Sequence, residues 1–126
     1  MEVKSILVVE RDIVVRHLLA QFLRDCGYRV AEAVSVEEAR EALSRRRVSF
    51  DVALINVPSR SRAAFELASW MRKNFPDTEV LLAGTVAKVL QYADDLCDGP
   101  DVPRSDHKAV LAQIRQALAG RKRSGS

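Results

Sequence analysis

The sequence predicts a doubly wound α/β fold, in which helices cover both faces of a parallel sheet. Two observations carry this prediction. Short apolar runs of strand length alternate along the chain with longer stretches whose apolar residues recur at helical spacing. Short loops separate these segments, and five strand and helix pairs of this kind favour parallel strands joined by right-handed crossovers. The chain has 126 residues, 48% of them hydrophobic and 29% charged, which suits one globular domain with its own core.

The first pair is a strand at residues 5–9, SILVV, followed by a helix. An unbroken apolar run of this length is typical of a parallel strand that is buried on both faces. Gly27 supplies a stop for the helix, because glycine readily adopts the left-handed turn that closes many helices. The apolar stripe of this helix consists of Val15, Leu18, Leu19, Phe22 and Leu23.

The second strand is expected at residues 28–33, YRVAEA, where apolar and charged residues alternate more, as they do near a sheet edge. Ser35 and Glu38 then have the spacing of a capping box, in which each side chain accepts a backbone N–H of the other residue. The helix that follows has Val36, Ala39 and Leu43 on one face.

The remaining pairs follow the same pattern. Residues 51–56, DVALIN, predict a third strand, and residues 79–84, EVLLAG, predict a fourth. A helix with the stripe Ala64, Phe65, Ala68, Met71 and Phe75 lies between them, and Thr85 can cap the helix after the fourth strand. The weaker segment 96–102, LCDGPDV, is the candidate for a fifth strand, and a last helix carries Val110, Leu111, Ile114, Ala117 and Leu118. We assign residues 1–119 to the domain and 120–126 to a basic flexible tail.

Composition excludes several classes of protein. No apolar run is long enough to span a bilayer and no basic and apolar leader opens the chain, so we expect a cytoplasmic protein without a membrane partner. Cys26 and Cys97 lie far apart without a CxxC spacing, and only His17 and His107 could join them, so the sequence indicates neither a disulfide framework nor a zinc site, and we expect both cysteines to be inert. The net charge is +3 and much of it comes from the tail, which argues against nucleic-acid binding by this domain.

A site in a doubly wound sheet is expected beyond the carboxyl ends of the strands, where the strand order reverses. The residues to consider therefore lie at 10–12, 56–59 and 83–85. Asn56 ends the third strand there, and an amide can neither ionise nor serve as a useful nucleophile. We expect it to be a structural amide that satisfies Glu10, Arg11 or loop N–H groups.

The motifs ILVVERD at 6–12, CGYRVAEA at 26–33, SVEEAREAL at 35–43 and FDVALIN at 50–56 resemble the receiver domain of two-component response regulators, and the likeness covers nearly the whole chain. The resemblance implies a flavodoxin-like five-stranded sheet of order 2-1-3-4-5. It also implies a switch in which an aspartate ending strand three accepts a phosphoryl group from a histidine kinase. Magnesium would be held by that aspartate and by an acidic pair after strand one, while a hydroxyl ending strand four and a lysine ending strand five would contact the phosphoryl oxygens.

This chain departs from the pattern at each chemical position. Asn56 stands at the phospho-acceptor position, and the acidic pocket has become Glu10 and Arg11, followed by Asp12. A guanidinium cannot ligate magnesium, which prefers hard oxygen ligands. Ala83 replaces the switch hydroxyl. Three registers are open for the lysine, namely Gly99 with Pro100, Val102 with Pro103, or Pro103 with Arg104, and none of them places a lysine there.

We therefore predict an atypical receiver-like domain, not an enzyme, that acts through protein contacts without aspartate phosphorylation. Its partner would be a signalling protein or another copy of the chain. We expect no cofactor, and Mg²⁺ binding that is weak or absent, with Arg11 serving as an internal cation for Glu10 and Asp12. The alternative is a regulatory domain that binds a small anion or a nucleotide through Arg11, Arg60 and Arg62, although no glycine-rich phosphate loop follows the first strand. A third possibility, a phosphate acceptor at Ser59 or Ser61, lacks a nearby base or metal.

Overall fold

The computed structural model describes residues 3–45, 50–57, 61–98, 112–113 and 116. Its strands and helices alternate from the first strand onwards. They are β1 (Ser5–Glu10), α1 (Ile13–Asp25), β2 (Arg29–Ala33), α2 (Val36–Arg45), β3 (Val52–Asn56), α3 (Arg62–Asn74), β4 (Glu79–Ala83) and α4 (Val86–Leu96). The described residues contain no helix that is both long and apolar enough to cross a membrane.

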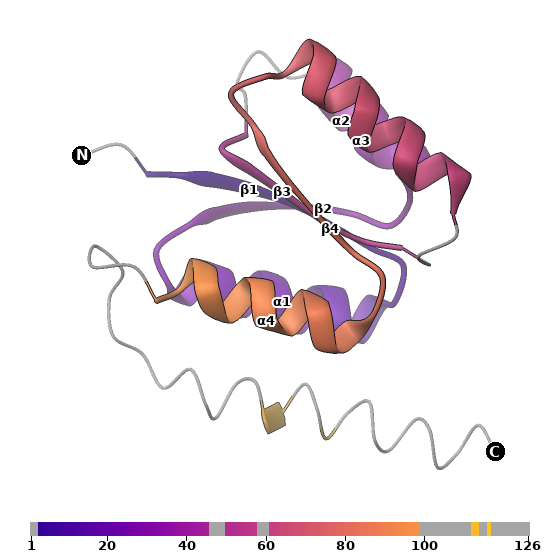
Figure 1. Ribbon diagram of the computed structural model, residues 1–126. Coiled ribbons are helices and arrows are strands. Elements are labelled where there is room, and N and C mark those ends of the chain that lie inside the picture. The colour runs from indigo at the N-terminus through magenta and orange to yellow at the C-terminus, as the bar shows by residue number, and fades with distance from the viewer. Residues whose placement is uncertain (1–2, 46–49, 58–60, 99–111, 114–115, 117–126) are drawn as a thin grey trace, which may run out of the picture.

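All strand pairs in the described sheet are parallel, and the strand order is β2-β1-β3-β4 (Figure 1). The predicted α/β class is confirmed, and so is the predicted order of these strands. β1 and β3 lie in the middle and are buried along almost their whole length, as their unbroken apolar sequences indicate. Most of the segment expected to form a fifth strand lies outside the described residues, but Leu96, its first residue, ends α4.

Local signals in the sequence account for the helix ends. Asp12 caps α1, since its carboxylate accepts the N–H groups of Val14 and Val15, and Gly27 follows that helix with a φ of 99°. Ser35 Oγ accepts the N–H of Glu38 at 3.1 Å, at the capping box that the sequence predicts. The N-cap residues of α3 and α4 are Ser61 and Thr85.

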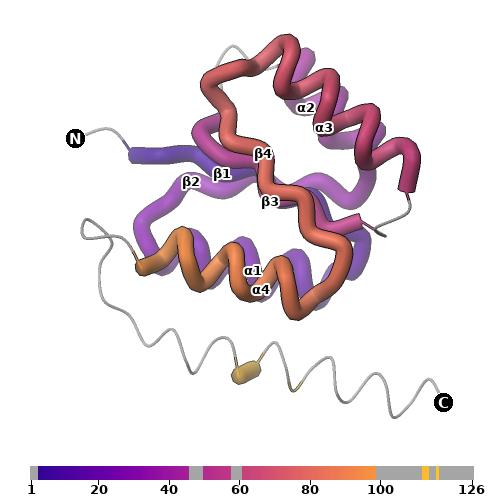
Figure 2. Tube along the Cα trace, in the orientation of Figure 1, coloured from indigo at the N-terminus to yellow at the C-terminus, as the bar shows by residue number. Residues whose placement is uncertain are grey.

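The sheet separates two apolar cores. On one face, alternate residues of β1 and β3 pack against α2 and α3, with Leu7, Val9, Ala53, Ile55, Leu67 and Met71 among the buried residues. On the other face, the intervening residues of the same strands pack against α1 and α4, with Ile6, Val8, Leu54, Leu19, Phe22 and Leu90 among them. Figure 2 shows the two helical layers on opposite sides of the sheet.

The side on which α4 lies departs from the predicted topology. Five pairs joined by right-handed crossovers would place α4 on the face of α3, because both helices would then lead outward to the next strand in the same direction. Instead α4 lies beside α1, and Val89, Leu90 and Ala93 belong to the core on that face. The helical spacing predicts which residues of α4 are buried, but it carries no information about which face of the sheet they cover.

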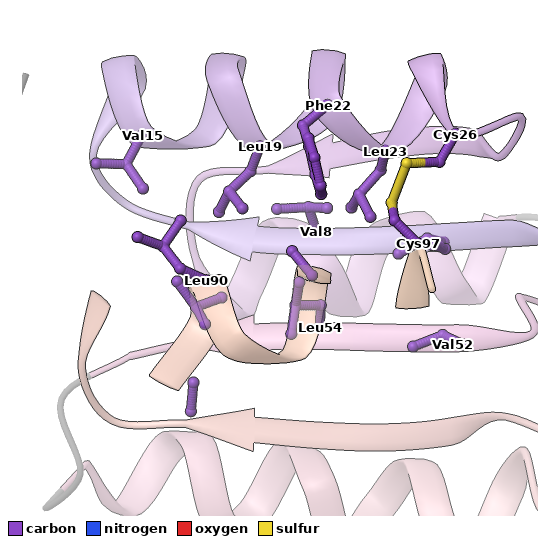
Figure 3. Close-up of a cluster of buried hydrophobic side chains, with 14 residues drawn as sticks. Val8, Val15, Leu19, Phe22, Leu23, Cys26, Val52, Leu54, Leu90 and Cys97 are labelled. Carbon is purple, nitrogen blue, oxygen red and sulfur yellow. A yellow bond between two sulfur atoms is a disulfide. The ribbon is translucent and has the colours of Figure 1, made fainter. Parts of the chain in front are cut away.

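A disulfide joins Cys26, the C-cap of α1, to Cys97, the C-cap of α4 (Figure 3). The sequence does not indicate this bond, and the expectation that both cysteines are inert is wrong. Their Cα atoms are 5.7 Å apart, and both side chains are buried in the core between α1, α4 and the sheet. The cysteines are 71 residues apart in sequence, and only the packing of α4 beside α1 brings them together. Next to this bond, the Tyr28 hydroxyl donates to the Leu96 carbonyl.

Candidate functional site

The candidate site is a row of three residues at the carboxyl ends of neighbouring strands. Glu10 ends β1, Asn56 ends β3 and Ala83 ends β4. In the parallel ladder Glu10 is the register partner of Asn56, and Asn56 is the register partner of Ala83. The structure thus brings together the acidic, acceptor and hydroxyl positions that the resemblance implies, beside the point between β1 and β3 where the strand order reverses.

A buried hydrogen bond joins the first two members of the row. Asn56 Nδ2 donates to Glu10 Oε1 at 2.6 Å, and the two residues are 9% and 5% exposed. The other oxygen, Oε2, accepts the backbone N–H of Asp12 at 3.0 Å. Both oxygens of the Glu10 carboxylate therefore have donors, and no buried side-chain polar atom in the described part of the chain lacks a hydrogen-bond partner. Of the partners considered for the amide, the structure assigns Glu10.

Burial raises the pKa of the Glu10 carboxyl above its ordinary value of 4.5. Removing a carboxylate from water disfavours its charged form, and this effect outweighs the opposing ones. The hydrogen bond from Asn56 is the largest opposing effect, followed by a backbone N–H and by the positive charges of Arg16 and then Arg11. The amide thus helps to keep a buried carboxylate ionised, a task that an aspartate at the same position could not perform.

Arg16, which sequence reasoning did not single out, is the arginine that contacts the end of β1. Its Nη1 donates to the Glu10 carbonyl at 3.1 Å, and its Nε lies 3.3 Å from Glu32 Oε1 on β2. Arg11, the residue expected to serve as the internal cation, is exposed and has the smaller effect on the Glu10 pKa. Arg16 lies in the first turn of α1, where its backbone N–H donates to the Asp12 carbonyl. Its side chain reaches the Glu10 carbonyl because α1 folds back over the end of β1.

Two members of the row, Glu10 and Asn56, line a depression of about 320 Å³. The lining residues are Glu10, Arg11, Asn56, Val57, Gly84, Thr85 and Val86. Ala83 provides no hydroxyl, and the nearby Thr85 uses its Oγ1 to accept the N–H of Lys88 at 3.1 Å as the cap of α4. The depression therefore has the position of a switch-point site without the hydroxyl that would contact a phosphoryl group.

The remaining predicted site residue, Asp12, has a structural contact in its cap of α1. No three His, Cys, Asp or Glu side chains within the described residues converge in a group that could hold a metal ion. The expectation of weak or absent Mg²⁺ binding stays a prediction. Anion binding also stays a prediction, and Arg60, one of the three arginines expected to bind the anion, lies outside the described residues. Arg62 is exposed on α3 and lies 3.6 Å from Glu66. Ser59 and the registers for the lysine also fall outside the described part of the chain.

These features define a small doubly wound α/β domain with a polar pair at its switch point. No family model matches the sequence, and no curated protein matches it. Solved structures do match. A response regulator from Thermotoga maritima is 19% identical, over 94% of this chain and 99% of the other, with a TM-score of 0.59.

Two further neighbours are of the same kind. A CheY-like receiver domain protein from Methanospirillum hungatei JF-1 is 18% identical, over 98% of this chain and 99% of the other, with a TM-score of 0.58. The non-phosphorylated HemR receiver domain from Leptospira biflexa is 26% identical, over 74% of this chain and 75% of the other, with a TM-score of 0.53. The chain therefore has the fold of the CheY-like receiver domains of response regulators.

Proposed function

We propose that the protein is an atypical receiver domain of two-component signalling, which acts by binding a partner protein and does not use aspartate phosphorylation. The observation that carries the proposal is the buried hydrogen bond from Asn56 to Glu10. It occupies the place at the strand ends where the receiver resemblance puts a phospho-acceptor and part of a magnesium site.

The chemistry of the row supports this function. An acyl phosphate needs a carboxylate, and the amide of Asn56 has no free lone pair for attack on phosphorus. The amide is also engaged with Glu10, so the carboxylate that could approach a metal already has a donor on each oxygen. A fold that retains its two cores but carries an amide and a methyl group at these strand ends fits a role as a binding module.

Phosphoryl transfer provides the direct test. The full chain is incubated with acetyl phosphate and millimolar Mg²⁺, and intact mass is followed beside a receiver domain known to accept phosphate under the same conditions. We expect no phosphoryl adduct on this chain. A stoichiometric adduct that hydroxylamine removes would contradict the proposal, because it would reveal an acyl phosphate. A stable adduct at Ser59 or Ser61 would contradict it equally.

The binding role is tested in the cells that produce the protein. Affinity capture is carried out with the full chain before and after acetyl phosphate treatment. We expect the same signalling proteins, or the chain itself, in both samples, because the treatment leaves the domain unchanged. Capture only after treatment would oppose the proposal. The cytoplasmic location stays a prediction, and the disulfide weighs against it because cytosolic thiols are usually kept reduced.

A further inference from the structure

The disulfide joins the C-terminal ends of two neighbouring helices. Cys26 is the C-cap of α1, and Cys97 is the C-cap of α4. The two residues are 2% and 4% exposed, and they belong to the apolar core between these helices and the sheet (Figure 3). The bond therefore lies where it holds one helix end against the other.

The two helix ends differ in their local stability. α1 carries Arg24 in its last turn, where a positive charge complements the helix dipole, and Gly27 follows the helix with a φ of 99°. The last turn of α4 contains Asp94 and Asp95, and Asp98 follows its C-cap; all three are exposed. Negative charge at this end of a helix opposes the dipole, and aspartate is a weak helix former. The local sequence therefore favours a closed end for α1 and an open end for α4.

Few contacts hold the last turn of α4 closed against this tendency. The buried apolar residues of the helix end at Ala93, and they fix its earlier turns to the sheet. Beyond them, Leu96 packs partly against the core, and its carbonyl accepts a hydrogen bond from the Tyr28 hydroxyl. The covalent bond at Cys97 is the strongest of these attachments. The closed form of this turn thus depends on the oxidation state of two cysteines.

We propose that the Cys26–Cys97 disulfide is a redox switch that controls the C-terminal turn of α4. In the oxidised chain the turn is closed against α1. In the reduced chain residues 94–98 detach, while Val89 and Leu90 keep the earlier turns of α4 on the sheet. Detachment uncovers the apolar surface around Tyr28, so this surface is presented in the reduced state alone. The inference concerns α4 and stands whether or not the domain binds a partner or accepts a phosphoryl group.

The switching reaction is thiol–disulfide exchange with a dithiol. One thiolate of the dithiol attacks a sulfur of the bond, forms a mixed disulfide and releases the other cysteine as a thiolate. The second thiolate of the dithiol then releases the first cysteine, and the reagent leaves as a disulfide. Two electrons pass to the protein, and two protons complete the thiols of Cys26 and Cys97. The reverse exchange with a disulfide reagent restores the bond. Because both cysteines are buried, the turn of α4 must open before a thiolate can attack.

Hydrogen exchange tests the structural change. The full chain is kept oxidised or is reduced with dithiothreitol, and amide exchange at short labelling times is followed by mass spectrometry. We expect exchange in the last turn of α4 to become about tenfold faster on reduction and to recover on reoxidation, while β1 and β3 stay protected in both states. The Cys26→Ala, Cys97→Ala double variant is the control, and it should exchange like the reduced chain with or without dithiothreitol.

Two outcomes of this experiment would overturn the proposal. Equal exchange of α4 in both states would mean that the bond does not control the turn. Loss of protection throughout β1 and β3 on reduction would mean that the bond supports the whole fold, and a switch needs two folded states.

The rate of reduction tests the role of the acidic turn. The full chain is treated with excess dithiothreitol, quenched with acid and alkylated, and the reduced fraction is read from intact mass. Asp95→Lys places a cation in the last turn of α4, so it should favour the closed turn and slow reduction about threefold or more. The matched control is Asp25→Lys, which makes the same change in charge at the exposed end of α1, beside Cys26. Both variants attract an anionic thiolate, so the control should be reduced as fast as the wild-type chain or faster. A rate that Asp95→Lys leaves unchanged or raises would contradict the switch, as would equal slowing by both variants.

Discussion

At the scale of single residues, the row Glu10, Asn56 and Ala83 places only one carboxylate at the ends of β1, β3 and β4. A site with clustered carboxylates needs a cation to hold them together, because like charges in contact raise one another's pKa. Here the neighbour of the buried Glu10 is a neutral amide that donates to it at 2.6 Å. The amide satisfies the carboxylate without adding charge. The Glu10 carboxylate is therefore satisfied by hydrogen bonds from Asn56 and from the Asp12 N–H.

Replacing Asn56 with aspartate should destabilise the fold and create a site for Mg²⁺. Asn56→Asp removes the donor and places a second carboxylate against Glu10, so we expect the free energy of unfolding to fall by about 2–4 kcal/mol at neutral pH. Millimolar Mg²⁺ should raise the melting temperature of the variant and leave that of the wild-type chain unchanged, because only the variant presents two carboxylates.

A matched control is Asn74→Asp, which makes the same change at an exposed residue where the amide donates to the Trp70 carbonyl. It should cost less than about 1 kcal/mol and gain nothing from Mg²⁺. A wild-type chain that Mg²⁺ clearly stabilises would show that the site binds the ion despite its amide.

The raised pKa of Glu10 predicts a particular pH dependence. The folded state holds the Glu10 proton more tightly than the unfolded state, whose pKa is near 4.5. The group therefore contributes stability below that value and loses the contribution as the pH rises through the folded pKa. Glu10→Gln abolishes the titration, so the wild-type free energy of unfolding should fall relative to the variant between pH 4.5 and neutrality. Urea unfolding of both chains at several pH values measures this, with Glu66→Gln as a control for the loss of an exposed carboxyl group.

At the scale of elements, the sequence predicts where helices and strands begin and end better than it predicts how they pack together. Asp12 and Ser35 have short side-chain oxygens just before helical stripes, and Gly27 follows one, so the helix ends could be predicted. Asn56 could be placed at a switch point because β3 is unbroken and apolar. These are contacts between residues close in the chain, or consequences of strand order.

Three features were missed because they depend on packing. The sequence of α4 fits either face of the sheet, since an apolar stripe such as Val89, Leu90 and Ala93 can cover any apolar surface. The disulfide follows from that choice, since Cys26 and Cys97 meet only when α4 lies beside α1. Arg16 reaches the Glu10 carbonyl because α1 folds back over the end of β1, and its spacing from Glu10 matches no motif.

At the scale of the whole molecule, the disulfide links the last described helix to the first one. The cysteines are 71 positions apart, and the stretch between them includes every described strand except β1, so the bond limits how far the unfolded chain can expand. Chain-entropy arguments assign a loop of this length a stabilisation of about 4 kcal/mol, and disulfides typically contribute about 2–4 kcal/mol. The same bond holds α4 beside α1.

Removing the bond should therefore lower stability without altering the strand-end row. The Cys26→Ala, Cys97→Ala double variant should lose about 2–4 kcal/mol in urea unfolding, with a further small cost for the lost sulfur packing. A reductant should lower the stability of the wild-type chain toward that of the variant and leave the variant itself unaffected. Thiol counting under denaturing conditions, before reduction, should find no free cysteine. Two free thiols, together with a wild-type stability that ignores reductant, would show that the cysteines only pack against each other. In that case α4 would be held beside α1 by its apolar stripe and by the Tyr28 hydrogen bond alone.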